Sequence, residues 1–295
     1  KGHEALLQLD YGGFTDSYNK KVSVWSATVL TAGRLHQPEH IDIFFDAANM
    51  IDEDGRAGAK KDGTTGFFCL CELLDPTKGV TDGVQGPSEK DGKRPKISLF
   101  KYKFPFVTNI ILSGDTGNGF RGYEMLEQLS TVFEKFYYQV ELAPLSPAHA
   151  HNRTDSRIAH MNTFLRQVKR RTRVSGAKQI ATLFHRAADI SADKQTARKF
   201  MKRSSIFFRV VTDDVDIQHE HKKLLKASMA NPTWESDKVG VQGLLYFNFS
   251  TIPEDQGRRD AGELDHPVGY ARARQYGDPN KDANPTLLYT WRTDL

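Results

Sequence analysis

The chain has 295 residues, of which 38% are hydrophobic and 26% charged, and its formal net charge is +4. This length suits one large domain or two modest ones, and no apolar run approaches the roughly 20 residues of a membrane span. The chain begins at Lys1, without Met and without a secretory leader pattern, so we expect a piece of a longer protein.

The N-terminal part predicts three strands that open a sheet. Strand patterns cover 5–10, 22–30 and 41–45, and the second alternates polar with apolar residues. Between the first two, the stretch 11–17 predicts a turn, in which Gly12 and Gly13 supply unusual backbone angles.

An insertion is predicted after the third strand, at about residues 55–95. Gly, Lys, Asp and Pro are frequent in the loops at both ends of this segment. Its apolar run, 66–74, fits a strand or a helix. The run contains Cys69 and Cys71, which alternation places on one face of a strand. Buried, reduced thiols are the simplest interpretation, because such a pair alone makes a poor zinc site. The absence of a disulfide framework favours an intracellular protein.

The rest of the chain alternates strand and helix patterns. Strands are predicted at 96–102, 109–112, 137–142, 205–211 and 243–248, and helices at 120–136, 177–190 and 192–202. A long helix also follows Asn152, with apolar residues facing inward and bases covering the rest: Arg157, Arg166, Lys169, Arg170, Arg171 and Arg173. Alternation after an antiparallel opening indicates an α/β fold with a mixed sheet.

Positive charge is concentrated in residues 151–203, which hold 14 Lys and Arg against three acids. Such asymmetry suggests a surface for a polyanion. A well-solvated helical face is the alternative, since Lys and Arg are ordinary helix formers.

Three aspartates occupy separate predicted elements. Asp10 ends the first strand, Asp115 follows the strand at 109–112, and Asp155 lies at the start of the long helix. Three such carboxylates are what a two-metal phosphodiester site needs. Taken singly, Asp115 also fits a helix cap, and Asp155 fits the first turn of a helix capped by Asn152. His149 and His151 alternate just before that helix and suit metal or phosphate contact, or two buried hydrogen-bonded histidines.

The stretch Pro147-Ala-His-Ala-His-Asn-Arg-Thr-Asp155 resembles a sequence block of DDE/D-type transposases and integrases of eukaryotic DNA transposons. That block is (P)GHTH/K-x-x-x-D, and the resemblance covers about residues 5–174. It departs at Ala148, where the family has Gly, and in the Gly-rich stretch 113–119. The third acid is Asp, not the Glu of the retroviral type.

The resemblance implies an RNase H-like mixed sheet flanked by helices, with the insertion after the third strand and a C-terminal α+β extension. Residues 1–174 would form the catalytic core, and 175–295 a basic helical segment with a small extension of unknown role. Carried over by position, Asp10, Asp115 and Asp155 hold two Mg²⁺ or Mn²⁺ ions, and His149 matches the family's His before the third acid. His151, Asn152, Arg153 and the six bases of the long helix would contact DNA.

The function that this implies is cutting and joining of DNA phosphodiester bonds by a nuclear protein. DNA and a second copy of the chain are the expected partners, with no membrane and no small-molecule cofactor. Two alternatives stay open: an RNase H-like nuclease without strand transfer, and a transposase-derived nucleic-acid-binding protein without chemistry.

Overall fold

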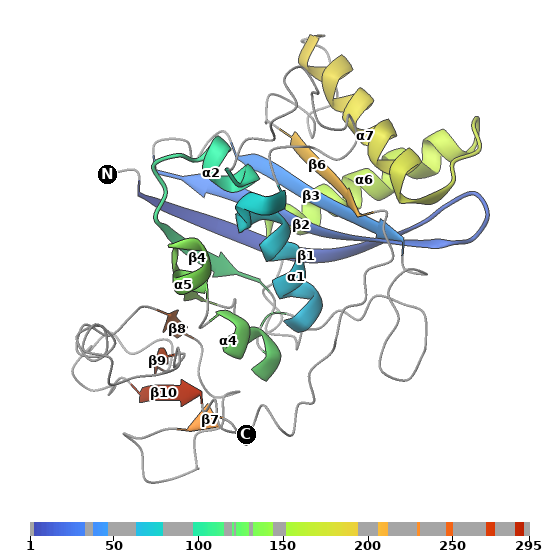
Figure 1. Ribbon diagram of the computed structural model, residues 1–295. Helices are drawn as coiled ribbons and strands as arrows, with labels where there is room; N and C mark the ends of the chain where they lie inside the picture. The colour runs from blue at the N-terminus through green and yellow to red at the C-terminus, as the bar shows by residue number, and fades with distance from the viewer. Residues whose placement is uncertain are drawn as a thin grey trace.

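A mixed β-sheet organises the chain in a computed structural model (Figure 1). The structure describes residues 3–32, 38–46, 63–78, 97–114, 120, 122–129, 132–143, 152–193, 206–211, 229–230, 246–249, 270–274 and 287–291. The first three strands pair antiparallel: β1 (Glu4–Thr15), β2 (Lys21–Thr31) and β3 (Glu39–Asp46). β4 (Asn109–Ser113) then pairs parallel with β1, and β5 (Gln139–Leu142) parallel with β4.

Strands from the C-terminal part extend both edges of this sheet. β6 (Ile206–Val211) pairs parallel with β3 at one edge. At the other edge, β8 (Tyr246–Phe249) pairs antiparallel with β5. β9 (Tyr270–Arg274), β10 (Leu287–Trp291) and β7 (Met229–Ala230) follow it in that order. The fold is therefore α/β with a mixed sheet, and described strands of residues 175–295 belong to the sheet that the first half begins.

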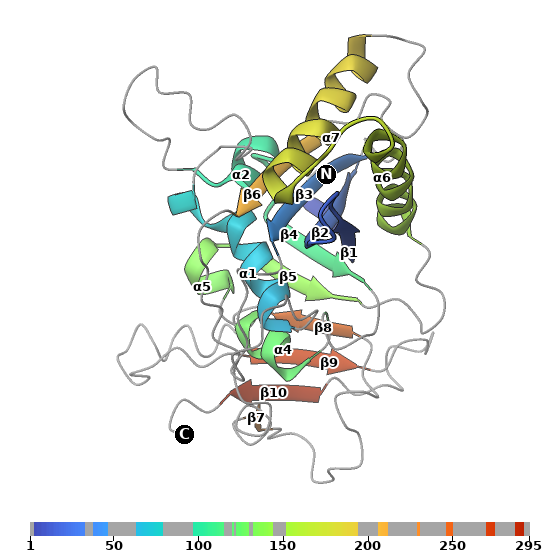
Figure 2. The ribbon, with the colours of Figure 1, turned by 90° about the vertical axis from the view of Figure 1, so that its right-hand side faces the viewer.

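Helices cover the two faces of the first strands (Figure 2). α1 (Gly63–Leu74), α2 (Leu99–Lys103), α4 (Tyr123–Leu129) and α5 (Val132–Phe136) contribute to the larger hydrophobic core. α6 (Arg153–Lys169) and α7 (Gly176–Asp193) pack on the opposite face around Phe14, Phe44 and Phe184. None of the helices that the structure describes combines the length and the apolar character of a bilayer span.

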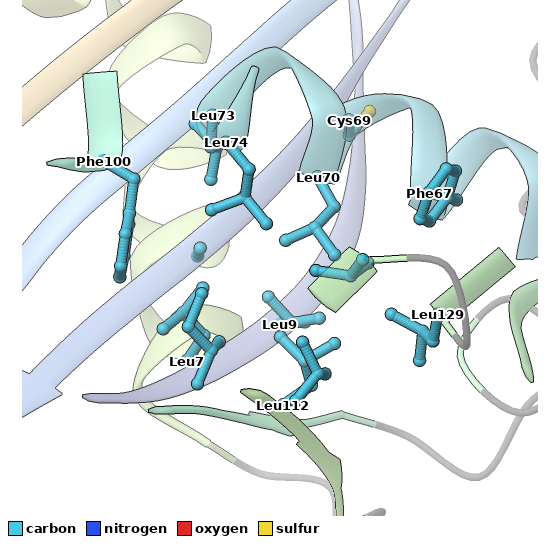
Figure 3. Close-up of a cluster of buried hydrophobic side chains, with 14 of the residues drawn as sticks. Leu7, Leu9, Phe67, Cys69, Leu70, Leu73, Leu74, Phe100, Leu112 and Leu129 are labelled. Atoms are coloured by element: carbon cyan, nitrogen blue, oxygen red, sulfur yellow. The ribbon is translucent and has the colours of Figure 1, made fainter. Parts of the chain in front are cut away.

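Alternation along β1 divides its side chains between these two layers. Leu7 and Leu9 point into the larger core, where Leu70 and Leu74 of α1 meet them (Figure 3). The residues that alternate with them along the strand, such as Asp10 and Gly12, face the other way. A Cβ on Gly12 would lie 2.7 Å from Cγ2 of Ile158, so this is the face that α6 covers.

That close approach explains the first correction to the sequence interpretation. The turn predicted over 11–17 is wrong in its first half, because β1 continues through Gly12 and Gly13 to Thr15. Gly12 serves helix packing and not turn geometry, since α6 leaves no room for a side chain there. The left-handed residue of the hairpin is Asn19, with φ of 63°.

The structure decides one open alternative, corrects one predicted strand and bears on two predicted helices. The run 66–74 belongs to α1, within the predicted insertion, and its side chains lie in the main core. The strand predicted at 96–102 is instead α2, for which Ser98 Oγ accepts a bond from the N–H of Lys101 at 3.1 Å. Within the helix predicted over 120–136, the described residues form α4 and α5. The helix predicted at 192–202 lies outside the described residues after Asp193.

The cysteines lie on α1, so their predicted strand face is wrong. The prediction of buried, reduced thiols is confirmed for Cys69, whereas Cys71 is half-buried, and neither forms a disulfide. Burial raises the pKa of Cys69 well above its usual value and that of Cys71 to about 12.

Candidate functional site

Three segments of the chain meet at the backbone of Leu9. From the start of α6, Asn152 Nδ2 donates to the Leu9 carbonyl at 3.4 Å, and Thr154 Oγ1 donates to the Gln8 carbonyl at 2.7 Å. From the end of β4, Gly114 approaches so closely that an added Cβ would lie 3.4 Å from the same Leu9 oxygen. Residues far apart in sequence thus surround one point on β1.

Asp10 follows Leu9 and lies half-buried on the face of β1 that α6 covers. Its Oδ1 accepts a hydrogen bond from the backbone N–H of Tyr11 at 2.7 Å. This bond fixes one oxygen of the carboxylate against the backbone that follows it.

Asp155 is the third residue of α6 and completes a capping box. The Asn152 side-chain oxygen accepts from the N–H groups of Thr154 and Asp155 at 2.8 and 3.0 Å. Asp155 Oδ2 accepts in return from the Asn152 N–H at 3.1 Å. The capping interpretation of this stretch is confirmed, and the metal role of Asp155 stays a prediction.

The remaining site residues predicted from the sequence are either outside the described residues, accessible at the surface, or buried. Asp115, His149 and His151 lie outside the described residues. Arg153, Arg166, Arg170, Arg171 and Arg173 are exposed, and Lys169 is half-buried, with its Nζ donating to the Thr15 carbonyl at 2.8 Å. These cations are accessible to a polyanion, as the sequence predicted, and their contact with DNA stays a prediction.

Two predicted DNA contacts are corrected by burial. Arg157 is 4% exposed and pairs with Asp42 of β3: its Nη2 lies 2.5 Å and its Nε 3.2 Å from Oδ2. Asn152 is also buried, and its amide is engaged by the helix cap and by Leu9. Neither side chain faces a surface where a phosphate would lie.

The Arg157–Asp42 pair belongs to a buried polar layer beneath α6. Cross-strand register aligns Asp10 with Ser26 and Ser26 with Asp42. Ser26 Oγ donates to Asp42 Oδ1 at 2.5 Å, so the carboxylate is bonded from both β2 and α6. The sequence interpretation missed this layer, although polar residues two apart, Ser26 with Thr28 and His40 with Asp42, signalled it.

His40 lies in the adjacent row of the same layer. Its Nδ1 is 3.1 Å from Thr28 Oγ1, which lies 2.8 Å from Thr154 Oγ1. Burial lowers the pKa of His40 to about 2, with further lowering by Arg157 and Arg153. The imidazole is therefore neutral in the folded protein near neutral pH.

The lowered pKa of His40 predicts that acid reduces the stability of the folded protein. The unfolded chain, with His40 near its usual 6.5, binds the extra proton, so His40 contributes stability above that pH and loses it below. We expect the free energy of unfolding to fall by about 2 kcal/mol from this group between pH 6.5 and about 5. Urea unfolding at both pH values checks this in the parent and in His40→Asn.

The exposed His160 provides the control for this experiment. His160→Asn should keep the parental pH dependence, whereas His40→Asn should lose the part that His40 supplies. Equal acid sensitivity of His40→Asn and the parent would contradict the assignment.

No protein-family model matches the chain, and neither the curated proteins nor the solved structures gave a match. Among the described residues, which leave out Asp115, His149 and His151, no group of three or more His, Cys, Asp or Glu is placed to hold a metal ion. The contacts around Leu9 are therefore the structural support for the candidate site.

Proposed function

We propose that this chain is the catalytic domain of a DDD-type transposase or integrase that cuts and joins DNA phosphodiester bonds. One observation carries the proposal. The start of α6 is bonded to the β1 backbone at Gln8 and Leu9, so the first turn of α6, which holds Asp155, lies against the part of β1 that leads into Asp10. The protein would act in the nucleus, and a second copy of the chain is among the proposed partners.

The sheet supports the finer proposal of an RNase H-like fold. In that fold the catalytic carboxylates converge because the first and fourth strands are neighbours and the last helix packs across them. Here β1 and β4 are parallel neighbours, with Gln8 opposite Ser113, and α6 packs on β1. Gly114 lies against Leu9, and these two residues precede Asp115 and Asp10 in the chain.

The donor atoms near Leu9 fit hard divalent cations, which prefer carboxylate oxygens. Asp10, Asp115 and Asp155 would hold two Mg²⁺ or Mn²⁺ ions. When bound, such a pair activates the attacking water or 3′-hydroxyl and stabilises the leaving oxygen. The capping box fixes Asp155 on α6, and the bond from the Tyr11 N–H orients Asp10.

The surrounding side chains would hold the substrate. His149 and His151 precede the third acid and would contact phosphate. The accessible cations of α6 and of the turn after it would neutralise the DNA backbone: Arg153, Arg166, Lys169, Arg170, Arg171 and Arg173. Such contacts give affinity and register without reading base sequence.

A specific observation favours one alternative, a DNA-binding protein without chemistry. Asp155 already has a structural role in the capping box, so its presence is explained without a metal. An RNase H-like nuclease that cuts without joining is the other alternative, since it would use the same three carboxylates.

End-labelled duplex DNA incubated with the protein and Mg²⁺ or Mn²⁺ tests the proposal. We expect cut and joined products that EDTA abolishes, and calorimetry should detect binding of Mn²⁺ alone. Cut ends without joined products would assign the nuclease. DNA binding with neither metal binding nor products would assign the DNA-binding protein and overturn the proposed chemistry.

A further inference from the structure

A groove lies between the far end of β1 and the exposed side of α6. It encloses about 560 Å³ and is lined by Gly13, Thr15, Ala159, Asn162, Thr163, Leu165, Arg166 and Lys169. In the described residues, β4 pairs with β1 only as far as Gln8, and Lys169 of α6 bonds the Thr15 carbonyl at the far end of the strand. Figure 2 shows α6 beside the first strands.

The groove combines positive charge with unused hydrogen-bond donors. Lys169 Nζ donates to the Thr15 carbonyl at 2.8 Å, which holds the ammonium across the groove between α6 and β1. An ammonium has three donors and a guanidinium five, so Lys169 and the exposed Arg166 retain donors for an anion. Among the lining residues none is acidic.

Gly13 lines the groove without a side chain. It is exposed, and the nearest atom to a Cβ built on it is the Val22 carbonyl oxygen at 3.9 Å. A side chain there would therefore meet no clash among the described residues.

Both walls of the groove lead back to the candidate site. β1 runs from Asp10 to Thr15, and α6 runs from Asp155 to Lys169. The lining residues 162–169 lie about 10–20 Å along the helix from Asp155, at 1.5 Å per residue. This separation corresponds to about three to six nucleotides of one DNA strand, at 3.4 Å per nucleotide along the duplex axis.

We propose that this groove binds the sugar-phosphate backbone of a DNA strand, about three to six nucleotides from the phosphate that Asp10 and Asp155 address. This inference rests on the proposed function. It assigns Arg166 and Lys169 to a defined contact, with the rigid edge of β1 as the opposite wall.

Substitutions at Gly13 and at the two cations test the groove by independent routes. Binding of a fluorescein-labelled DNA duplex of random sequence is measured in EDTA over a range of salt, so that no chemistry is required. We expect Gly13→Ala to bind like the parent, and Gly13→Gln and Gly13→Glu to bind progressively more weakly. Arg166→Gln with Lys169→Gln should lower the salt slope by about two, because each phosphate contact contributes about 0.9.

The matched control removes two exposed cations of α7, Lys178→Gln with Arg186→Gln, and should leave the salt slope near the parental value. Thermal unfolding of each variant checks that the fold is kept. If the parent binds DNA but the Gly13 and Arg166/Lys169 variants bind as well as it does, the groove inference fails and the proposed function stands. If the parent does not bind DNA, both fail. Tighter binding of an RNA duplex through the same groove would overturn the assignment of DNA.

Discussion

Replacing Asp10 by Asn is expected to lower metal-dependent DNA cleavage more than about 100-fold while leaving the protein folded. Loss of a residue that merely orients a metal ligand costs about 10–100-fold, so loss of a ligand's charge should cost more. Asn keeps an oxygen that accepts from the Tyr11 N–H, which Asp10 now binds at 2.7 Å. Cleavage rates under saturating Mn²⁺ and calorimetric Mn²⁺ binding measure the loss.

Asp155 allows its two roles to be separated. Asp155→Asn keeps an acceptor for the Asn152 N–H, which Oδ2 now binds at 3.1 Å, but removes the charge. We expect it to unfold near the parental temperature and to be inactive. Asp155→Ala removes the acceptor as well and should also lose about 1 kcal/mol of stability, the usual cost of a lost cap.

Asp75 provides the matched control, because its carboxylate also accepts a backbone N–H, that of Thr77 at 2.8 Å, outside the candidate site. Asp75→Asn should cleave like the parent. Full activity of Asp155→Asn would show that Asp155 is only a capping residue, and full activity of Asp10→Asn would remove the basis of the catalytic proposal.

Local sequence pattern predicted the elements whose cause is local. β2, β3 and β4 follow from short runs of β-branched and apolar residues, and α6 follows from a cap and a helical apolar stripe. The run 66–74 was ambiguous because a short apolar run fits either state. It becomes a helix that packs Leu70 and Leu74 onto β1.

Long-range contacts decided what the sequence pattern missed. Gly12 was interpreted as a turn residue because the Ile158 side chain, which excludes a Cβ there, is 146 positions away in the chain. Arg157 was interpreted as a surface base for the same reason, since its partner Asp42 is 115 positions away. The capping of α6 by Asn152 was predictable, but not the bond from the same amide to Leu9 that places the helix on β1.

Substitution of Arg157 by Met is expected to have the largest effect on stability. Asp42 is 0% exposed, so removing the guanidinium leaves a buried carboxylate without the cation that balances it, although Ser26 still donates to it. Breaking a buried ion pair from one side costs about 3–5 kcal/mol, a large part of the roughly 5–15 kcal/mol that stabilises a typical domain. Urea unfolding at neutral pH measures the change.

The double variant Asp42→Asn with Arg157→Met keeps this prediction measurable if the single variant does not fold. It removes both charges together, and the introduced amide oxygen still accepts from Ser26 Oγ, which now lies 2.5 Å from Asp42 Oδ1. We therefore expect the double variant to be more stable than Arg157→Met alone, and a double-mutant cycle measures the coupling energy between the two residues.

The exposed Arg186→Met serves as control and should change stability by less than about 0.5 kcal/mol. If Arg157→Met and Arg186→Met cost the same, the buried pair does not hold α6 on the sheet, and the position of the α6 N-terminus on β1 depends on the Asn152 and Thr154 bonds.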